Sequence, residues 1–256
     1  MRVLSVGWRL VHALLHALRG WVTITLVFPR LNPAERDARV QVWALQMLRV
    51  LGIGLEIRGT PPVRGPVLLV ANHISWLDIL VMHAARHCRF VAKSDVRRWP
   101  LIGTLATGGG TLYIERESRR DAMRVVHRMG RAFKAGDILA VFPEGTTSDG
   151  RNLLPFHSNL IQAAVATGTP VQPVALQFID AATGAMSLTP SYVGDDTLVG
   201  SVWRTVAGAR LTARVVYGEP EVAAGRDRRT WAADLRSGVQ RLRASATAPA
   251  AADVNP

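Results

Sequence analysis

The first thirty residues alternate polar and apolar positions with the period of an α-helix. Arg9, His16 and Arg19 belong to a polar stripe roughly 100° wide on a helical wheel. The wide remaining face is apolar and includes Trp8 and Trp21. A transmembrane helix needs about 20 consecutive apolar residues, and the arginines interrupt this stretch. The pattern predicts a helix that lies in the membrane interface, although a helix that covers a protein core is an alternative.

A second helix follows with clear start and stop signals. Asn32 is placed as the N-cap, Pro33 as the first helical residue and Glu35 as the partner in a capping box. Apolar positions then recur at helical spacing until Gly52, which is placed to end the helix. The two helices predict a membrane-associating hairpin over residues 1–52.

Beyond this hairpin, short apolar runs alternate with helical patterns, which is typical of an α/β domain. We predict a mixed, largely parallel sheet flanked by helices, over residues 53–243. Residues 181–202 are expected to form a loop with at most a short strand, and the Ala/Pro-rich tail, residues 244–256, to be disordered. The expected strands are residues 55–58, 67–71, 89–92, 111–114, 138–142, 171–178 and 211–217, and the expected helices are residues 76–86, 119–135, 159–166 and 230–242.

Composition narrows the classes of partner. The chain has 256 residues, 48% of them hydrophobic, which is enough for a substantial core. Its formal net charge of +12 comes almost wholly from arginine and favours acidic partners such as anionic lipid, an acidic carrier protein or nucleic acid. Nucleic-acid binding predicts basic stripes with interleaved aromatic residues, which the sequence lacks, so nucleic acid is not an expected partner. The single cysteine, Cys88, excludes an internal disulfide and fits a reducing, cytoplasmic compartment.

The strongest chemical signal lies in residues 72–78, N-H-I-S-W-L-D. His73 follows an apolar strand, and Asp78 comes where a helix begins. If the chain curls there, the Asp78 carboxylate accepts one imidazole N–H, fixes the tautomer and leaves the other ring nitrogen as a general base. The spacing alone leaves open an ordinary histidine beside a helix cap.

Two further polar motifs follow predicted strands, where open α/β sheets build their sites. Residues 110–116, G-T-L-Y-I-E-R, place Arg116 just past a strand. Residues 142–148, F-P-E-G-T-T-S, place a turn with Glu144 and Gly145 past another strand. Together with the His73 segment they form an ordered series.

In this order the motifs resemble those of the glycerolipid acyltransferase family, which includes 1-acylglycerol-3-phosphate acyltransferases. That family is marked by N-H-x-x-x-x-D, then G-x-x-[FY]-[IL]-x-R, then F-P-E-G-T, then a short apolar run around a proline, here Pro173 in residues 171–174. Lys93 resembles the family's linking segment. The resemblance covers roughly residues 55–220.

The resemblance implies a 1-acyl-sn-glycerol-3-phosphate O-acyltransferase of phospholipid biosynthesis. His73 deprotonates an acceptor hydroxyl, Asp78 orients the imidazole, and no covalent acyl-enzyme is required. Acyl-CoA or acyl carrier protein serves as co-substrate, with no metal or other cofactor. The expected partners are membrane lipids, and the expected location is the cytoplasmic face of the inner or plasma membrane. We leave the oligomeric state open.

The resemblance also implies an acceptor site. Arg116 is expected to hold an anionic headgroup, and backbone N–H groups near Gly145 to stabilise the oxyanion. The substrate-binding candidates are Arg116, Glu144, Gly145, Thr146 and Thr147, and the accessory candidates are Asn72, Lys93, Arg151 and Pro173. A salt bridge between Glu144 and Arg116 is an alternative for those two side chains.

One position departs from the family pattern. The family commonly has arginine after F-P-E-G-T, whereas this chain has Thr147, which removes a cation expected to face an acceptor phosphate. Either Arg151 substitutes, or the acceptor lacks a phosphomonoester, as for related enzymes that acylate lyso-ornithine lipid, to which residues 142–150 are similar. Lysophosphatidic acid stays first because it is the commonest acceptor in the family. A nonenzymatic basic membrane- or nucleic-acid-binding protein is the rival class, and it predicts that His73 is dispensable.

Two other patterns carry less weight. His83 and His87 stand four residues apart on a predicted helix, but no third ligand accompanies them, so packed or solvated histidines are expected rather than a metal site. Residues 103–111 are rich in glycine like a phosphate-binding loop. Gly109 stands where such a loop requires lysine, which excludes nucleotide hydrolysis.

Overall fold

The computed structural model describes residues 2–114 and 119–247 of the chain. Its strands are β1 (Ile53–Arg58), β2 (Val67–Ala71), β3 (Arg89–Lys93), β4 (Leu112–Ile114), β5 (Ile138–Val141), β6 (Val171–Asp180) and β7 (Leu211–Tyr217). They form a seven-stranded sheet in the order β1-β7-β6-β2-β5-β3-β4. Neighbouring strands pair in parallel except β6 and β7, which are antiparallel. The sheet is mixed and largely parallel, as the sequence predicts.

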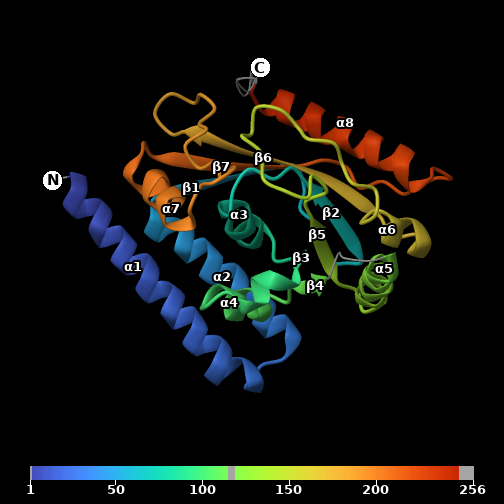
Figure 1. Ribbon diagram of the computed structural model, residues 1–256, viewed down its shortest axis with the longest axis horizontal. Helices are drawn as coiled ribbons and strands as arrows, with labels where there is room; N and C mark the ends of the chain where they lie inside the picture. Colours follow the sequence, from blue (N-terminus) through green and yellow to red (C-terminus); the bar gives the residue numbers. More distant parts are fainter. Residues whose placement is uncertain (1, 115–118, 248–256) are drawn as a thin grey trace, which may run out of the picture.

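Helices cover both faces of this sheet (Figure 1). They are α1 (Arg2–Val22), α2 (Pro33–Leu51), α3 (Leu77–Ala85), α4 (Ile102–Gly108), α5 (Arg119–Lys134), α6 (Gln162–Thr167), α7 (Leu198–Ala207) and α8 (Arg228–Thr247), with the short helical turns η1 (Thr23–Val27), η2 (Phe28–Arg30) and η3 (Ser94–Arg98). Side chains from α1, α2, α3 and α7 share one buried cluster, and side chains from α5, α6 and α8 share another. The predicted fold class is confirmed.

The central strand β2 explains why two separate cores form. Its residues are all buried, because parallel strands covered on both faces need an unbroken apolar run. Leu69 points into the cluster beneath α3, whereas Leu68 and Val70 point into the cluster beneath α8. There the fully buried Trp231 anchors α8 to the sheet. The strand that leads to His73 is therefore held from both sides.

The first two helices pack side by side. The capping box of Asn32 and Glu35 is present, and Gly52 ends α2 with a φ of 77°, which favours glycine. His16 and Trp43 each hydrogen-bond the other's carbonyl, at 3.0 and 3.1 Å, and their rings stack 5.3 Å apart. A residue of the polar stripe thus fastens α1 to α2.

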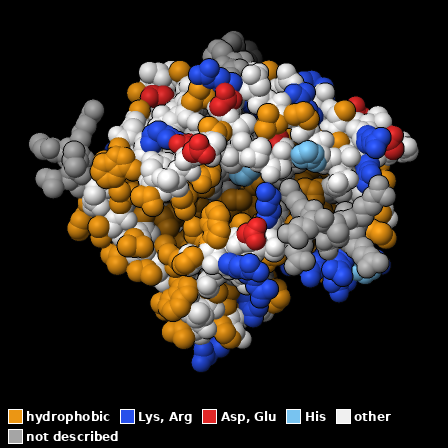
Figure 2. Space-filling view, in the orientation of Figure 1, with side chains coloured by type: hydrophobic (Ala, Val, Ile, Leu, Met, Phe, Trp, Pro, Cys, Tyr) orange, Lys and Arg blue, Asp and Glu red, His pale blue; other side chains and the backbone are white. Residues whose placement is uncertain are grey.

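The apolar face of α1 points away from the protein. Trp8 is 67% exposed, and Leu14, Leu15 and Leu18 are also exposed. A helix that only covers a core buries such a face, so the orientation disagrees with that alternative. In the described part of the chain, Ser5–Arg30 is long and apolar enough to cross a membrane by length and composition alone. Figure 2 shows hydrophobic side chains along this edge and around a hollow in the middle of the same face.

Three segments depart most from the sequence prediction. The segment expected to be a loop, residues 181–202, contains the start of α7, and α4 occupies a glycine-rich stretch that was not predicted as helix. Helix α8 continues to Thr247, so Ala244 to Thr247 are helical instead of disordered. Ala246 is buried there and its carbonyl accepts a hydrogen bond from Arg214. The rest of the predicted disordered tail lies outside the described residues.

Candidate active site

The turn between β2 and α3 converges on one carboxylate oxygen. Asp78 Oδ2 lies 2.8 Å from His73 Nδ1 and accepts hydrogen bonds from the backbone amides of Ile74, at 2.6 Å, and Ser75, at 2.9 Å. The Asp78 side chain is fully buried. Because its oxygen serves both the backbone turn and the imidazole, the two interpretations that the spacing left open, helix cap and histidine partner, occur together.

The His73 ring is held with one nitrogen free. Since the carboxylate of Asp78 accepts at Nδ1, the proton of the neutral ring belongs on Nδ1 and the lone pair on Nε2. No group in the described part of the chain hydrogen-bonds Nε2, and the side chain is 19% exposed. Phe142 stacks on the imidazole with ring centroids 4.0 Å apart, and Phe90 stacks on Phe142. This arrangement suits a general base.

The Glu144 side chain holds the backbone of the turn that carries His73. One carboxylate oxygen accepts the backbone N–H of His73 at 2.8 Å, and the other accepts that of Leu154 at 2.9 Å. Burial raises the pKa of Glu144, although these two amides oppose the rise. The side chain is buried, so it links the His73 turn to the loop after β5. Direct contact between Glu144 and an acceptor stays a prediction.

The next residues form a tight turn. Gly145 has a φ of 75°, and its N–H donates to the Phe142 carbonyl at 3.1 Å. That amide is therefore engaged within the turn. Thr146 is exposed, and among the described residues its N–H has no acceptor. The oxyanion donor that the sequence predicts near Gly145 stays a prediction, and Thr146 has the unengaged amide of the two.

Three positions were expected to determine the charge near the acceptor headgroup: Thr147, Arg151 and Arg116. The Thr147 hydroxyl donates to the carbonyl of Tyr192. Arg151 is 67% exposed along its side chain and lies 3.9 Å from Asp149. Arg116, the principal headgroup candidate, lies outside the described residues, so its role stays a prediction.

Of the other three accessory candidates, Asn72 links two strands, and Lys93 and Pro173 lie away from His73. Asn72 is buried and exchanges two hydrogen bonds with the backbone of Leu176, which ties the end of β2 to β6. Lys93 is exposed at the end of β3. Pro173 packs beside Gly218, beneath α8 and on the opposite face of the sheet from α3. The structure brings only Asn72 next to the catalytic turn.

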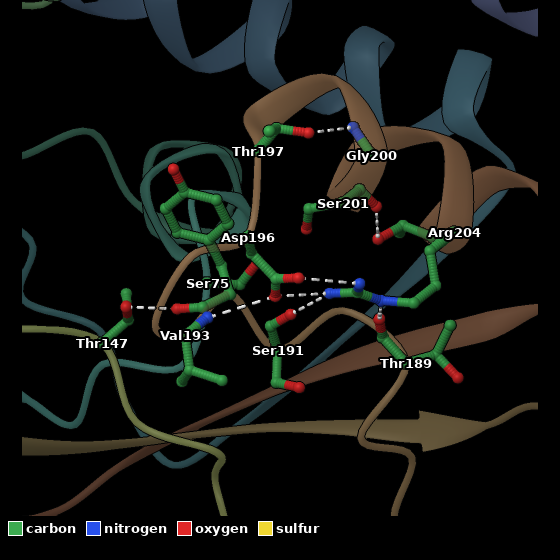
Figure 3. A network of polar contacts seen from close by, with 12 residues as sticks. Ser75, Thr147, Thr189, Ser191, Val193, Asp196, Thr197, Gly200, Ser201 and Arg204 are labelled. Atoms are coloured by element: carbon green, nitrogen blue, oxygen red, sulfur yellow. Dashed lines mark hydrogen bonds and ion pairs between the residues drawn. The ribbon is translucent and has the colours of Figure 1, made fainter.

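Several residues around the site were not predicted. Arg243 on α8 donates to the Gly150 carbonyl, and the pKa of its guanidinium is lowered by burial, with Glu144 opposing that shift. Arg204 on α7 bonds the loop that precedes this helix (Figure 3), and Tyr192 of that loop bonds Thr147 and Ile74. Arg243 bonds backbone carbonyls, and Arg204 bonds two backbone carbonyls besides the Asp196 carboxylate. A bond to a backbone carbonyl leaves no signature in the sequence.

Other reactive side chains do not form a competing site. Cys88 is buried, and burial raises the pKa of its thiol, so it is not available as a thiolate nucleophile. His83 and His87 are buried and stack 5.2 Å apart. The described residues include no group of three or more His, Cys, Asp or Glu side chains that is able to hold a metal ion.

Comparison with known proteins identifies the family. The acyltransferase family model matches residues 54–177. A 1-acyl-sn-glycerol-3-phosphate acyltransferase from Neisseria meningitidis is 39% identical over 186 residues, which cover 72% of either chain. This chain belongs to the glycerolipid acyltransferase family. It is therefore an O-acyltransferase, which confirms the enzyme class predicted from its motifs.

Other relatives of this acyltransferase have a second acceptor in their names. A lyso-ornithine lipid O-acyltransferase from Pseudomonas aeruginosa is 34% identical over 87% of this chain and 85% of its own length. The crystal structure of the 1-acyl-sn-glycerophosphate acyltransferase PlsC from Thermotoga maritima superposes with a TM-score of 0.60 at 21% identity. It covers 92% of this chain and 98% of that one, which supports the fold.

Proposed function

We propose that this acyltransferase transfers an acyl chain from a thioester donor to the free hydroxyl of 1-acyl-sn-glycerol-3-phosphate at a membrane surface. The observation that carries the proposal is the His73–Asp78 pair, 2.8 Å apart, with no hydrogen bond from any described residue to His73 Nε2. An enzyme that uses direct attack by the acceptor hydroxyl needs such a base and no nucleophile of its own.

In the proposed reaction one proton passes from the acceptor hydroxyl through His73 to the leaving thiolate, and a C–O bond replaces a C–S bond. His73 Nε2 takes the proton of the acceptor hydroxyl while its oxygen attacks the thioester carbonyl and forms the new C–O bond. Asp78 stabilises the imidazolium that results. The tetrahedral intermediate then collapses, the C–S bond breaks, and the leaving thiolate receives the proton from His73. Donors are acyl-CoA or acyl carrier protein, and the chain's net charge of +12 suits either anionic donor.

The oxyanion requires donors near the attacked carbonyl. The Gly145 amide bonds the Phe142 carbonyl, whereas the Thr146 amide is free of acceptors among the described residues. Thr146 follows the Glu144 brace that holds the His73 backbone, so its amide lies on the same rigid turn. We assign the Thr146 amide as the first donor to the oxyanion.

Lyso-ornithine lipid is the second candidate acceptor. The residue that follows F-P-E-G-T is Thr147, whose hydroxyl bonds Tyr192, so this position contributes no cation for a phosphate. Arg151, which was expected to replace the missing arginine at position 147, is exposed and lies beside Asp149. The Pseudomonas aeruginosa relative also spans more of both chains than the Neisseria meningitidis relative does. A phosphate-free headgroup agrees with these observations.

The exposed apolar surface supports a peripheral position at the membrane. It runs along α1 and includes Trp8, Leu14 and Leu15, and α7 adds Val199, which is 80% exposed, and Trp203 (Figure 2). Tryptophans and leucines on an otherwise cationic protein suit the headgroup boundary of an anionic bilayer. The cytoplasmic face of the inner or plasma membrane is where both thioester donors occur.

Acyl transfer by protein reconstituted in anionic vesicles tests the proposal. Both donors are offered with lysophosphatidic acid or lyso-ornithine lipid, and His73→Ala is compared with His127→Ala, whose exposed histidine lies on α5. We expect transfer to lysophosphatidic acid that His73→Ala lowers by a factor of about 10² to 10⁴ and His127→Ala leaves unchanged. Undiminished transfer by His73→Ala refutes the mechanism. Transfer to lyso-ornithine lipid alone reverses the ranking of acceptors.

A further inference from the structure

One backbone residue connects two of the catalytic motifs. The N–H of Tyr192 donates to the carbonyl of Ile74, at 3.0 Å, directly after His73. The carbonyl of Tyr192 accepts the hydroxyl of Thr147, two residues beyond Gly145. Tyr192 belongs to residues 189–197, the 189–197 loop, which precedes α7. The loop is thus bonded to the neighbours of the general base and of the acceptor turn.

A single arginine holds the loop from the other side (Figure 3). Arg204 on α7 bonds both carboxylate oxygens of Asp196, at 3.1 and 2.9 Å. It also donates to the carbonyls of Thr189, at 3.1 Å, and Ser191, at 2.6 Å. This ion pair holds the pKa of Asp196 below its usual range. One guanidinium therefore fixes both ends of the loop.

Helix α7 is itself fastened to the catalytic turn. The indole N–H of Trp76 donates to the Ser201 hydroxyl at 3.2 Å, and the Thr197 hydroxyl caps the helix by accepting the N–H of Gly200 at 3.1 Å. Loop, helix and catalytic turn consequently form one connected body. A displacement of the loop is therefore transmitted to Ile74 and Trp76, which follow His73.

We propose that the 189–197 loop is a wall of the acceptor site and that Thr147 is a positioning residue that holds this wall. The inference rests on the proposed function, in which a lysolipid hydroxyl approaches His73 Nε2. A headgroup near that nitrogen lies beside the loop, because the loop bonds Ile74 and Thr147. At position 147 the family commonly has an arginine, which would offer a charge to the acceptor. In this chain the Thr147 hydroxyl holds the loop instead, and the shape of the loop selects the headgroup.

The proposal predicts a specific kinetic pattern. When the 189–197 loop is less firmly held, the bound lysolipid occupies a wider range of positions. KM for the lysolipid then rises, and the enzyme discriminates less between acceptor headgroups. The thioester donor does not depend on this wall, so its KM stays unchanged. Thr147→Ser keeps the hydroxyl, whereas Thr147→Val has nearly the same shape without the donor.

The first experiment compares these two variants in full-length protein on anionic vesicles. We expect Thr147→Val to raise acceptor KM about five- to tenfold, the factor that corresponds to one neutral hydrogen bond, and Thr147→Ser to stay within about twofold of wild type. Amide hydrogen exchange in the 189–197 loop is faster in Thr147→Val only. Thr147→Arg, which restores the family residue, breaks the same bond and should raise KM for both acceptors at least as much as Thr147→Val does.

A double-mutant cycle separates positioning from direct contact. Arg204→Gln releases the same loop from its other end, so Thr147→Val in that background has much less effect than alone. Arg210→Gln, at an exposed arginine close to α7, is the matched control and leaves both KM values unchanged. Independent, multiplicative effects of Thr147→Val and Arg204→Gln overturn the proposal, as does unchanged loop exchange in Thr147→Val.

Different results would refute acyl transfer to a lysolipid and the positioning role of Thr147. Absence of transfer by the wild-type protein to either lysolipid refutes the proposed function, whatever Thr147 does. A wild type that transfers normally, together with Thr147→Arg that gains activity on lysophosphatidic acid, refutes the positioning role alone. Such a gain shows that position 147 contacts the headgroup directly.

Discussion

Replacing Asp78 with asparagine isolates the negative charge beside His73. Three donors converge on Asp78 Oδ2, from the His73 ring and the amides of Ile74 and Ser75. The amide oxygen of asparagine must occupy that position, because an NH₂ group there faces three donors. The variant therefore keeps the His73 tautomer and the turn, and loses mainly the charge.

The size of the effect follows from distance and burial. Two unit charges about 4 Å apart interact by about 4 kcal/mol at an effective dielectric constant of about 20, and the asparagine dipole retains part of this. With His73 Nδ1 and Asp78 Oδ2 2.8 Å apart, we expect kcat/KM to fall about 10²- to 10³-fold. In the described structure Asp78 Oδ1 is buried without a hydrogen-bond partner, so the new NH₂ group lacks an acceptor. That adds a loss of stability of about 1–3 kcal/mol.

The assay is thiol release from acyl-CoA in lipid–detergent micelles, with stability followed by chemical denaturation. Asp95→Asn, at an exposed carboxylate in η3, is the matched control and should change neither quantity. A folded Asp78→Asn enzyme within about threefold of wild-type kcat/KM would show that the charge is not used in the transition state. The role of Asp78 would then reduce to that of a helix cap.

Three further predictions follow from packing and burial. Phe142→Leu removes the ring 4.0 Å from the His73 imidazole and should lower kcat about two- to tenfold with KM unchanged, in steady-state kinetics. Burial lowers the pKa of His83 to about 3, so near pH 6.5 only the unfolded chain binds a proton at this residue. The free energy of unfolding should therefore fall by about 1.4 kcal/mol between about pH 7.5 and about pH 5.5, as measured by chemical denaturation. In His83→Leu the fall over the same pH range should be smaller. Leu14→Ser with Leu18→Ser should weaken vesicle flotation by about 2 kcal/mol, and unchanged flotation would contradict the membrane-facing orientation of α1.

The strands and the His73–Asp78 contact were predictable because their causes are local. β2 and β7 have the predicted bounds, since buried strands must be apolar throughout their length or at alternate positions. His73 and Asp78 are five residues apart, so one turn brings them together. The capping box of α2 is likewise contained within four residues. In each case the residues that interact are neighbours in the sequence.

Helix α7 was missed because its burial reverses the usual pattern. Its buried face includes Ser201 and Thr205, whose hydroxyls bond Trp76 and a backbone carbonyl, while Val199 and Trp203 are exposed. A pattern that assigns hydroxyls to the outside and apolar side chains to the core cannot recognise such a helix. An apolar exposed face and a hydroxyl-rich buried face agree, however, with a helix between an active site and a lipid surface.

The acceptor side of the site resisted prediction for a related reason. Its order depends in part on bonds from Arg204 and Arg243 to backbone carbonyls, and any residue supplies a carbonyl. The sequence therefore revealed Thr147 only as a missing arginine, whereas the structure shows a hydroxyl bonded to Tyr192 across 45 residues of chain. We propose that acyl transfer depends on the local His73 turn and acceptor choice on this distant bond, which leaves relatives that share the motif free to differ in the lipid they acylate.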